Sequence, residues 1–327
     1  MRLGIIGAGM IVREFLPKLV AMDELEVVAV MARRPEAVRE VCDANGVPHA
    51  VTDFGELLAC GIDTAYVAVP NALHFAYCKQ ALEAGLNVVV EKPMASNALE
   101  AHELAWIARK RGAFLFEAIT AAHLPTFELV RSWLPRIGAV KLINANFSQY
   151  SSRYDAFRAG TVAPAFDPVQ AGGALMDLNV YNVHWVVDLF GKPEYQTYFA
   201  NVERGIDTSG TLVMRYRRFL ATCIAAKDCA GPKLFSIQGI DGHISLDLNP
   251  GLVGTAHLRL NDGTQEDVIE DYAGSARVVP EFRFFADCIR RGDHAACDRW
   301  LDKSVAVSEV LTAARLGAGI VFPSDDD

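Results

Sequence analysis

About the first 120 residues alternate between short apolar runs and amphipathic stretches, and this alternation limits the possible folds more than any other feature. The apolar runs are LGII, EVVAVMA, DTAYVAVP, NVVVEKP and AFLFEA. The stretches between them follow a helical period, and several end at a glycine, as helix C-termini often do. Repeated strand–helix–strand units form a parallel, doubly wound sheet with right-handed crossovers. We therefore predict an α/β domain with such a sheet over residues 1–122.

The pattern of apolar and polar residues changes near residue 139, where longer runs begin in which apolar and polar residues partly alternate. In KLINANFSQ, the apolar side chains fall on one face of a strand and the amides on the other. This pattern predicts an α+β domain over residues 123–327 with a large, mostly antiparallel open sheet. A C-terminal helix at about 299–318 can pack back on the first domain. The segment 151–173 follows neither period, and it is either a binding loop or lid or a surface excursion.

Composition excludes several classes of function. The chain has 327 residues and a formal net charge of −9, which disfavours phosphate-driven binding of nucleic acid. No apolar run reaches the length of a membrane span. The seven cysteines form no C-x-x-C pair, and the eight histidines show no metal-ligand spacing. We therefore expect a cytoplasmic protein that binds no metal, nucleic acid or membrane.

A glycine motif follows the first expected strand in GIIGAGMIV. Gly7 and Gly9 fit the first two positions of G-x-G-x-x-G, and Val12 stands at the third. In such a motif the first glycine allows a tight turn, and the second lets the backbone approach a pyrophosphate at a helix N-terminus. The position between a strand and a helix predicts a Rossmann-type dinucleotide site, with Met10 and Ile11 opening the helix.

The end of the second strand indicates which dinucleotide is bound. An acidic residue there would hold the ribose 2′-hydroxyl group of NAD. The sequence instead has Ala32, Arg33 and Arg34, and guanidinium groups match the oxygens of a 2′-phosphate. We predict NADP(H) as the cofactor, with NAD(H) possible. The alternative is a solvated basic pair at the start of a helix.

The apolar run VVVEKP ends on a charged pair and a proline. A strand so apolar is buried on both faces, and it can therefore serve as a rigid mount that presents the Lys92 ammonium group at a chosen place. The alternative is a lysine that merely reaches solvent at the end of a sheet.

A second group of polar side chains lies in GGALMDLNVYNVHWVVDLFG, which predicts a helix from about 173 to 190. Asp177, Tyr181 and His184 are spaced i, i+4 and i+7, which places them on one face. The alternative makes Tyr181 a core aromatic and Asp177 a partner of the helix dipole. For His184 a packed histidine is the favoured interpretation.

The stretches EKP, VPNALH and GGALMDLNVYNVH resemble the glucose-fructose oxidoreductase / inositol dehydrogenase / MocA-type family of pyridine-nucleotide oxidoreductases, and the similarity runs over nearly the whole chain. The resemblance implies that Lys92 touches both the nicotinamide ribose and the substrate hydroxyl group. It places the family's D-x-x-x-H/Y element on Asp177 and Tyr181, as in the glucose-fructose oxidoreductase and dihydrodiol dehydrogenase branches. Thr120 and Ala122 depart from the tryptophan and arginine of diol dehydrogenases, which weakens the substrate assignment.

By the same resemblance, Asn71 and His74 lie near the cofactor. We also include Pro70 and Glu91 among the expected cofactor-binding residues, and His184 among the expected substrate-binding residues. The open sheet then buries its free face in a subunit interface, which implies a homodimer or homotetramer.

The chemistry follows from the residue types. Oxidation of an alcohol by hydride transfer leaves a hydroxyl proton to be removed, so a base must reach that oxygen. A free tyrosine has a pKa of about 10, and a nearby ammonium group would lower the pKa of Tyr181 by stabilising its phenolate. We predict an NADP(H)-dependent oxidoreductase that acts on a secondary alcohol or carbonyl of a sugar, polyol or cyclic diol. Two alternatives stay open: a nucleotide-sensing regulator without turnover, and reduction of a substrate such as biliverdin.

Overall fold

The computed structural model describes residues 1–247, 254–269 and 274–326. They form two compact units: unit 1 comprises Met1–Thr120 and Gly274–Val305, and unit 2 comprises Ala121–Ala273 and Ala306–Asp327. The chain thus passes from unit 1 to unit 2 close to the boundary expected at residue 122. It returns to unit 1 for residues 274–305. The sequence analysis placed these residues in the second domain, and expected only a helix near 299–318 to contact the first.

Unit 1 contains a six-stranded parallel sheet in the order β3-β2-β1-β4-β5-β6. The strands are β1 (Arg2–Ile6), β2 (Glu26–Met31), β3 (His49–Val51), β4 (Thr64–Val67), β5 (Asn87–Glu91) and β6 (Leu115–Ala118). This order confirms the predicted doubly wound sheet. It also reverses between β1 and β4, and ligands of open α/β sheets bind in the crevice at such a switch point.

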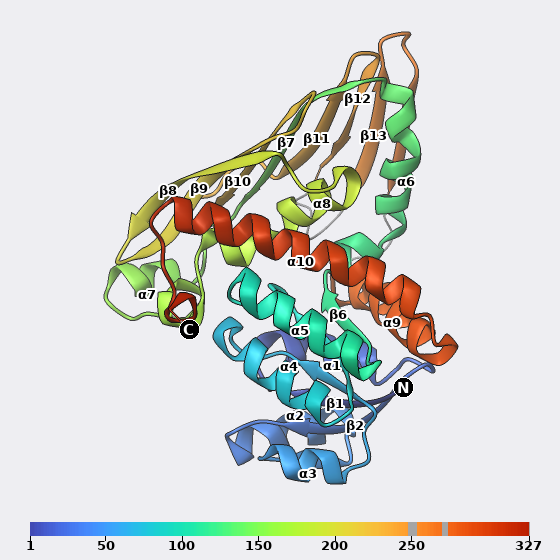
Figure 1. The fold of residues 1–327 in the computed structure, drawn as a ribbon, viewed down its shortest axis with the longest axis vertical. Helices are drawn as coiled ribbons and strands as arrows, with labels where there is room; N and C mark the ends of the chain where they lie inside the picture. Colours follow the sequence, from blue (N-terminus) through green and yellow to red (C-terminus); the bar gives the residue numbers. More distant parts are fainter. Residues whose placement is uncertain (248–253, 270–273, 327) are drawn as a thin grey trace. The chain divides into compact units, whose positions relative to one another are not determined.

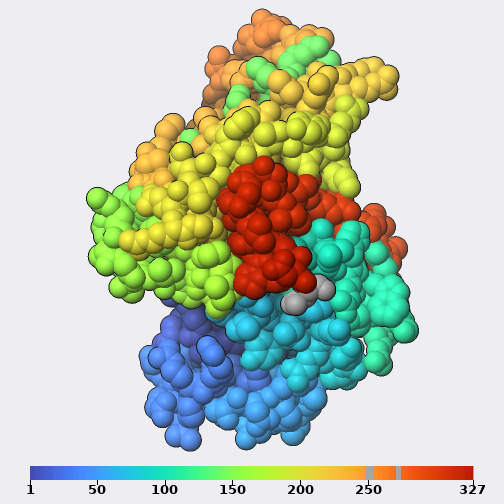
Figure 2. Space-filling model, turned by 60° about the vertical axis from the view of Figure 1, so that its left-hand side comes forward, coloured from blue at the N-terminus to red at the C-terminus, as the bar shows by residue number. Residues whose placement is uncertain are grey.

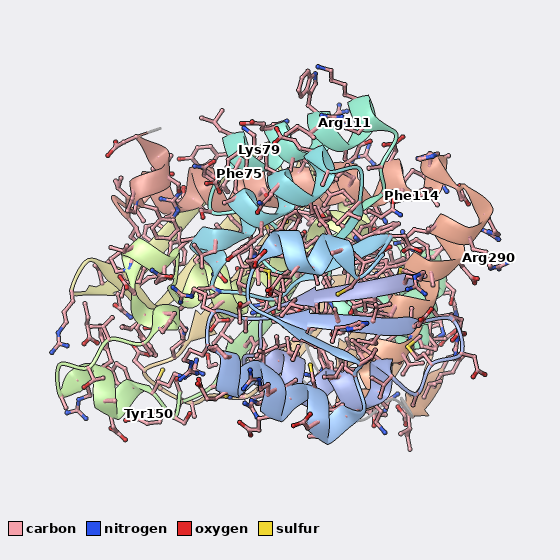
Figure 3. The ribbon with its side chains drawn as sticks, turned by 90° about the horizontal axis from the view of Figure 1, so that it is seen from below. Phe75, Lys79, Arg111, Phe114, Tyr150 and Arg290 are labelled. Atoms are coloured by element: carbon pink, nitrogen blue, oxygen red, sulfur yellow. The ribbon has the colours of Figure 1, made fainter. Side chains whose placement is uncertain are left out.

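Helices connect and cover these strands. They are α1 (Met10–Leu19), α2 (Pro35–Asn45), α3 (Phe54–Ala59), α4 (His74–Glu83), α5 (Ala98–Arg111) and α9 (Val278–Arg291), with the short turns η1 (Asn71–Leu73) and η7 (Gly274–Arg277) and the first part of α10 (His294–Gly317). Asp53 and Asn97 cap the N-termini of α3 and α5 through their side chains. On α4, the Lys79 ammonium group lies 5.5 Å from the ring centre of Phe75, and both residues are labelled in Figure 3.

Unit 2 contains an eight-stranded sheet in the order β14-β13-β12-β11-β7-β10-β9-β8. The strands are β7 (Val140–Ser148), β8 (Tyr195–Glu203), β9 (Ile206–Arg215), β10 (Leu220–Ala226), β11 (Leu234–Gly239), β12 (Gly242–Leu246), β13 (Thr255–Leu260) and β14 (Gln265–Ile269). All neighbouring strands are antiparallel except β7 and β10, which confirms the mostly antiparallel prediction.

One face of this sheet carries the core of unit 2. On β7, Ile143 and Ala145 are each 1% exposed, as their alternation predicted. They pack in one cluster with α6 (Pro125–Trp133), α8 (Val180–Phe190) and the last part of α10, which lie on the same side of the sheet in Figure 1. The opposite face leaves large apolar side chains exposed, among them Tyr195 and Phe199 at 64% and 65%.

The segment 151–173 is folded rather than structureless. It forms three short turns: α7 (Tyr154–Arg158), η4 (Pro164–Phe166) and η5 (Pro168–Gln170). The rings of Phe157 and Phe166 stack with their centres 4.9 Å apart and are almost fully buried. Tyr150, labelled beside α7 in Figure 3, stays exposed and donates a hydrogen bond to Asp155 (2.7 Å).

Arg315 on α10 ties down the last residues of the chain. Its buried guanidinium group donates hydrogen bonds to the Ile320 carbonyl and to Asp325, and it lies 3.8 Å from the ring centre of Phe322. Residues 320–326, which belong to the red region of Figure 2, are therefore held by contacts with α10. Among the described residues no helix combines the length and apolar character needed to cross a bilayer, and no cluster of side chains suits a metal ion.

Candidate active site

The glycine turn after β1 lies at the switch point of the unit 1 sheet. Gly7 has a φ of +127°, and a Cβ atom there would lie 2.2 Å from the Ala68 carbonyl oxygen at the end of β4. Only glycine therefore fits this close approach of two strand ends. Gly9 precedes α1, and no atom lies within 4 Å of the place a Cβ would take. The next residue, Met10, is 71% exposed, so backbone amides at the start of α1 can meet an anion.

The last two residues of the glycine motif, Ile11 and Val12, lie partly or fully inside unit 1. Val12, at the third glycine position, is 1% exposed and packs in the core, and Ile11 is partly buried. The larger side chain of Val12 is thus accommodated on the inner side of α1, away from the turn that would hold the pyrophosphate.

Two arginines follow β2, and both are exposed. Arg34 is the residue just before α2, and neither it nor Arg33 forms an ion pair with any residue that the structure describes. Arg13 differs, because both of its terminal nitrogens bind the Glu40 carboxylate (2.7 and 3.0 Å). Arg33 and Arg34 can therefore offer their guanidinium groups to an external phosphate.

Lys92 follows β5, and both of its neighbours are fixed. Glu91 accepts a hydrogen bond from the Tyr66 hydroxyl group (2.6 Å), and Pro93 is buried with its carbonyl 2.8 Å from His74 Nδ1. The Lys92–Pro93 peptide bond is cis. Lys92 itself is only partly buried. The backbone thus holds this lysine in one place while its side chain remains accessible.

Two further carboxyl groups lie beside this turn, and the sequence analysis missed both. Glu117 at the end of β6 accepts a hydrogen bond from the Met94 amide (2.9 Å). Glu281 on α9 is 1% exposed, and burial, reinforced by the charge of Glu91, raises its pKa well above the ordinary value. Burial raises the pKa of Glu91 as well, against the effects of Tyr66 and Lys92. An acidic residue on the apolar face of α9 was the signal that could have identified Glu281.

His74 joins two loops of the sheet. Its ring is fully buried, with Nδ1 2.8 Å from the Pro93 carbonyl and Nε2 2.9 Å from the Val69 carbonyl. Burial lowers the pKa of His74. The ring therefore connects the turns after β4 and β5, next to the partly buried Pro70 and Asn71. This placement suits a residue that positions the turns around the cofactor.

In unit 2, the predicted helix from 173 to 190 has two parts. A π-helical segment, η6 (Leu175–Asn179), precedes the α-helix α8. The Leu175 amide donates to the buried carboxylate of Asp207 (2.6 Å), which anchors the start of η6. The Asn179 side chain donates to the Cys223 carbonyl on β10 (3.0 Å) and anchors its end. Wide turns of this kind occur often at functional sites, and Asp177 lies in this one.

Asp177 is paired with a lysine that the sequence analysis did not single out. Lys227 Nζ lies 2.8 Å from Asp177 Oδ2, and the two side chains are 3% and 31% exposed, respectively. Lys227 directly follows the apolar strand β10, just as Lys92 follows β5. A lysine at the end of an apolar run was therefore the signal that could have revealed it.

The other two predicted residues lie on α8. Tyr181 is partly buried and packs against the core, with its ring centre 5.8 Å from that of Phe147. His184 is 4% exposed, as expected of a packed histidine. The predicted residues thus fall into two groups, with Lys92 and the cofactor residues in unit 1 and Asp177, Tyr181 and His184 in unit 2.

The glycines before η6 have a structural reason of their own. A Cβ at Gly173, where φ is +106°, would lie 2.1 Å from Asp207 Oδ1. A Cβ at Gly172 would lie 2.6 Å from the Pro164 carbonyl oxygen. Contacts within unit 2 therefore require glycine at both positions.

Comparison with known proteins places this architecture in a family. Residues 1–119 match an oxidoreductase family with an NAD-binding Rossmann fold, and residues 132–245 match the GFO/IDH/MocA C-terminal domain. The chain is 33% identical over 328 residues to a scyllo-inositol 2-dehydrogenase (NADP(+)) of Bacillus subtilis (strain 168), with 99% of each chain covered. It is 30% identical over 342 residues to trans-1,2-dihydrobenzene-1,2-diol dehydrogenase of Macaca fascicularis, again with 99% of each covered.

The fold also matches a solved structure, the 3-ketoreductase from Actinomadura kijaniata in complex with NADP and TDP-benzene. The TM-score is 0.83 at 24% identity, and 97% of each chain is covered. This similarity supports the fold, whereas the matches to both domains and the 33% identical relative confirm the family resemblance noted in the sequence. The chain therefore belongs to the GFO/IDH/MocA family of oxidoreductases with an NAD-binding Rossmann fold.

Proposed function

We propose that the protein is an NADP(H)-dependent oxidoreductase that transfers hydride between nicotinamide and a secondary alcohol or carbonyl group of a sugar, polyol or cyclic diol. Family membership over the whole chain is the observation that carries this proposal. The two relatives named above act on a polyol and on a cyclic diol, and one of them is named for NADP(+).

The residues of unit 1 fit a dinucleotide. The narrow turn at Gly7 and the open backbone at Gly9 leave room for a pyrophosphate at the start of α1. Arg33 and Arg34 can bind a 2′-phosphate, which favours NADP(H) over NAD(H). When bound, the nicotinamide supplies the hydride acceptor or donor.

The reacting oxygen requires groups from both units. Tyr181 removes the hydroxyl proton during oxidation and returns it during reduction. Lys92 stabilises the negative charge that develops on that oxygen and on the phenol. Asp177 accepts a hydrogen bond from a second substrate hydroxyl group and thereby orients the substrate. This mechanism requires the two units to present Lys92 and Tyr181 to the same substrate molecule.

We also expect the protein to form a homodimer or homotetramer through the open face of the unit 2 sheet. That face exposes Tyr195, Phe199, Leu142 and Leu220 to between 44% and 65%. Apolar patches of this kind on a sheet commonly mark interfaces. Light scattering of the purified protein measures the mass, and a monomer would contradict this part of the proposal.

Turnover assays test the proposed activity. Purified protein is mixed with NADP(+) or NAD(+) and with scyllo-inositol, trans-1,2-cyclohexanediol, glucose or cyclohexanol, and absorbance at the nicotinamide band is followed. We expect turnover of at least one polyhydroxy compound, with a higher kcat/KM for NADP(+) than for NAD(+). Lys92→Met should lose most of this turnover and keep its affinity for NADPH. Tight NADPH binding without turnover across the panel would favour the alternative, a nucleotide-sensing regulator.

A further inference from the structure

Lys227 is a buried lysine that directly follows β10 in unit 2. Its backbone N–H donates to the Thr208 carbonyl (2.8 Å), and its own carbonyl accepts from the Ser151 amide (2.9 Å). These bonds fix its backbone between β9 and the segment 151–173. Its side chain is only 3% exposed. Lysines are almost never buried to this extent unless their charge is paired.

The ammonium group of Lys227 has three close neighbours. It donates to Asp177 Oδ2 (2.8 Å) and to the Ala165 carbonyl (2.5 Å), and it lies 4.5 Å from the ring centre of Phe166. Asp207 is a second carboxylate that faces this charge, but its Oδ2 already accepts bonds from a backbone amide and a tyrosine hydroxyl group. Asp177 is therefore the carboxylate to which Lys227 is directly hydrogen-bonded.

We propose that Lys227 is a positioning residue for hydride transfer, which fixes the Asp177 carboxylate and keeps it ionised as the acceptor for a substrate hydroxyl group. The proposal rests on the function proposed above, in which Asp177 orients the substrate. With 31% of its side chain exposed, Asp177 can be reached by a ligand, whereas Lys227 cannot. An ionised carboxylate only accepts hydrogen bonds, so this pair favours substrates with a hydroxyl group beside the reacting carbon.

A purely structural role is the competing explanation. Lys227 could serve only to hold the segment 151–173 through Ala165 and Phe166. A neutral donor would satisfy the Ala165 carbonyl, however, whereas only a cation balances the charge of Asp177. Lys227→Gln and Lys227→Met therefore separate the two roles, because glutamine retains a hydrogen-bond donor and methionine does not.

The test compares these variants with Asp177→Asn and with the double variant Lys227→Met/Asp177→Asn. We expect both lysine variants to lose about ten- to a hundredfold in kcat/KM for trans-1,2-cyclohexanediol, the usual worth of a hydrogen bond to a charged group. Cyclohexanol lacks the second hydroxyl group, so its kcat/KM should change little. If Lys227 acts through Asp177, the double variant should be no worse than Asp177→Asn alone.

The pH profile gives a second readout. Without the cation, Asp177 takes up a proton more readily, so the acid limb of kcat/KM should move to higher pH in Lys227→Met. The same shift should persist in an Asp207→Asn background, which removes the other carboxylate that faces Lys227. Lys192→Met is the matched control, because Lys192 forms an exposed ion pair with Glu309 (2.5 Å) and should leave all these values unchanged.

Several results would overturn the proposal. Full activity in Lys227→Gln, or additive losses in the double variant, would leave Lys227 with a role in the loop alone. The same holds if both lysine variants unfold, by thermal denaturation, while Asp177→Asn stays folded. A wild-type protein that binds NADPH but turns over no compound would defeat the proposed function itself, and the positioning role with it. Wild-type turnover matched by Lys227→Met would defeat the positioning role only.

Discussion

The buried carboxylate of Asp207 anchors the segment that carries Asp177, and its ionisation can be measured. The side chain is 1% exposed, and Oδ2 accepts hydrogen bonds from the Leu175 amide (2.6 Å) and the Tyr198 hydroxyl group (2.7 Å). Burial raises the pKa of Asp207 from 3.8 to about 6, although both donors and Lys227 oppose this change. The folded protein therefore retains a proton at Asp207 in a pH range where the unfolded chain has lost it.

We expect Asp207→Asn to change how stability depends on pH. Between about pH 4 and pH 6 the folded state binds more protons than the unfolded state, so ionisation of Asp207 lowers the free energy of unfolding as pH rises. The difference between 3.8 and about 6 corresponds to about 3 kcal/mol. This cost is absent below about pH 4 and complete above about pH 6. Asparagine does not ionise. The free energy of unfolding of the variant, relative to that of wild type, should therefore rise by about 3 kcal/mol between pH 4 and pH 7.

Urea unfolding at several pH values from 4 to 7 measures this difference. Tryptophan fluorescence and far-UV circular dichroism should be followed together, because only coincident transitions justify a two-state free energy. Asp155→Asn is the control, since the Asp155 side chain is 76% exposed and its variant should run parallel to wild type. Parallel curves for wild type and Asp207→Asn would show that Asp207 ionises equally easily in both states, and would refute the reasoning.

Three further predictions concern the cofactor turn and the acid/base group. Gly7→Ala should lower the melting temperature and abolish NADPH binding, because its Cβ would meet a backbone carbonyl at the end of a strand. Gly9→Ala should weaken NADPH binding at an unchanged melting temperature. Thermal denaturation measures the melting temperature, and fluorescence titration measures NADPH binding. Arg33→Ala/Arg34→Ala should lose the preference for NADP(+) over NAD(+) in kcat/KM, and a retained preference would place the phosphate elsewhere. Tyr181→Phe should lower kcat by about two to four powers of ten, the usual worth of a positioned acid/base, and near-wild-type turnover would exclude Tyr181 from that role.

Local patterns were sufficient to predict the two sheets. On β7 the alternation of apolar and polar residues matches the burial of Ile143 and Ala145 at 1% exposure. The return of residues 274–305 to unit 1 was not predictable in the same way. The apolar face of α9 is visible in the sequence, but its partners are not, because Phe282 packs on Tyr66 and Phe285 on Phe116. Such contacts between distant segments leave no periodic signal.

The candidate site shows the same limit at the level of single residues. Asp177 was identified because an acid inside an apolar helical pattern is conspicuous. The π-helical turn around it was not, since five residues are too few to distinguish a π period from an α period. Lys227 was missed because a lysine followed by an aspartate after an apolar run suggests a polar turn. Only the three-dimensional structure shows that the Lys227 side chain is buried.

Lys92 and Lys227 occupy equivalent places in their own sheets, each directly after an apolar strand, yet their surroundings suit different tasks. Lys227 is 3% exposed and bound to Asp177, so it can stabilise a carboxylate but cannot reach a substrate. Lys92 is only partly buried, and its neighbour Glu91 is already engaged by Tyr66. An ammonium group that must stabilise a transient charge on a substrate oxygen has to be accessible, whereas one that orients a permanent anion works best when water is excluded. The difference in exposure therefore supports the proposed role of Lys92 in reaction chemistry and of Lys227 in orientation, and it predicts that an amine-reactive reagent modifies Lys92 far faster than Lys227 in the folded protein.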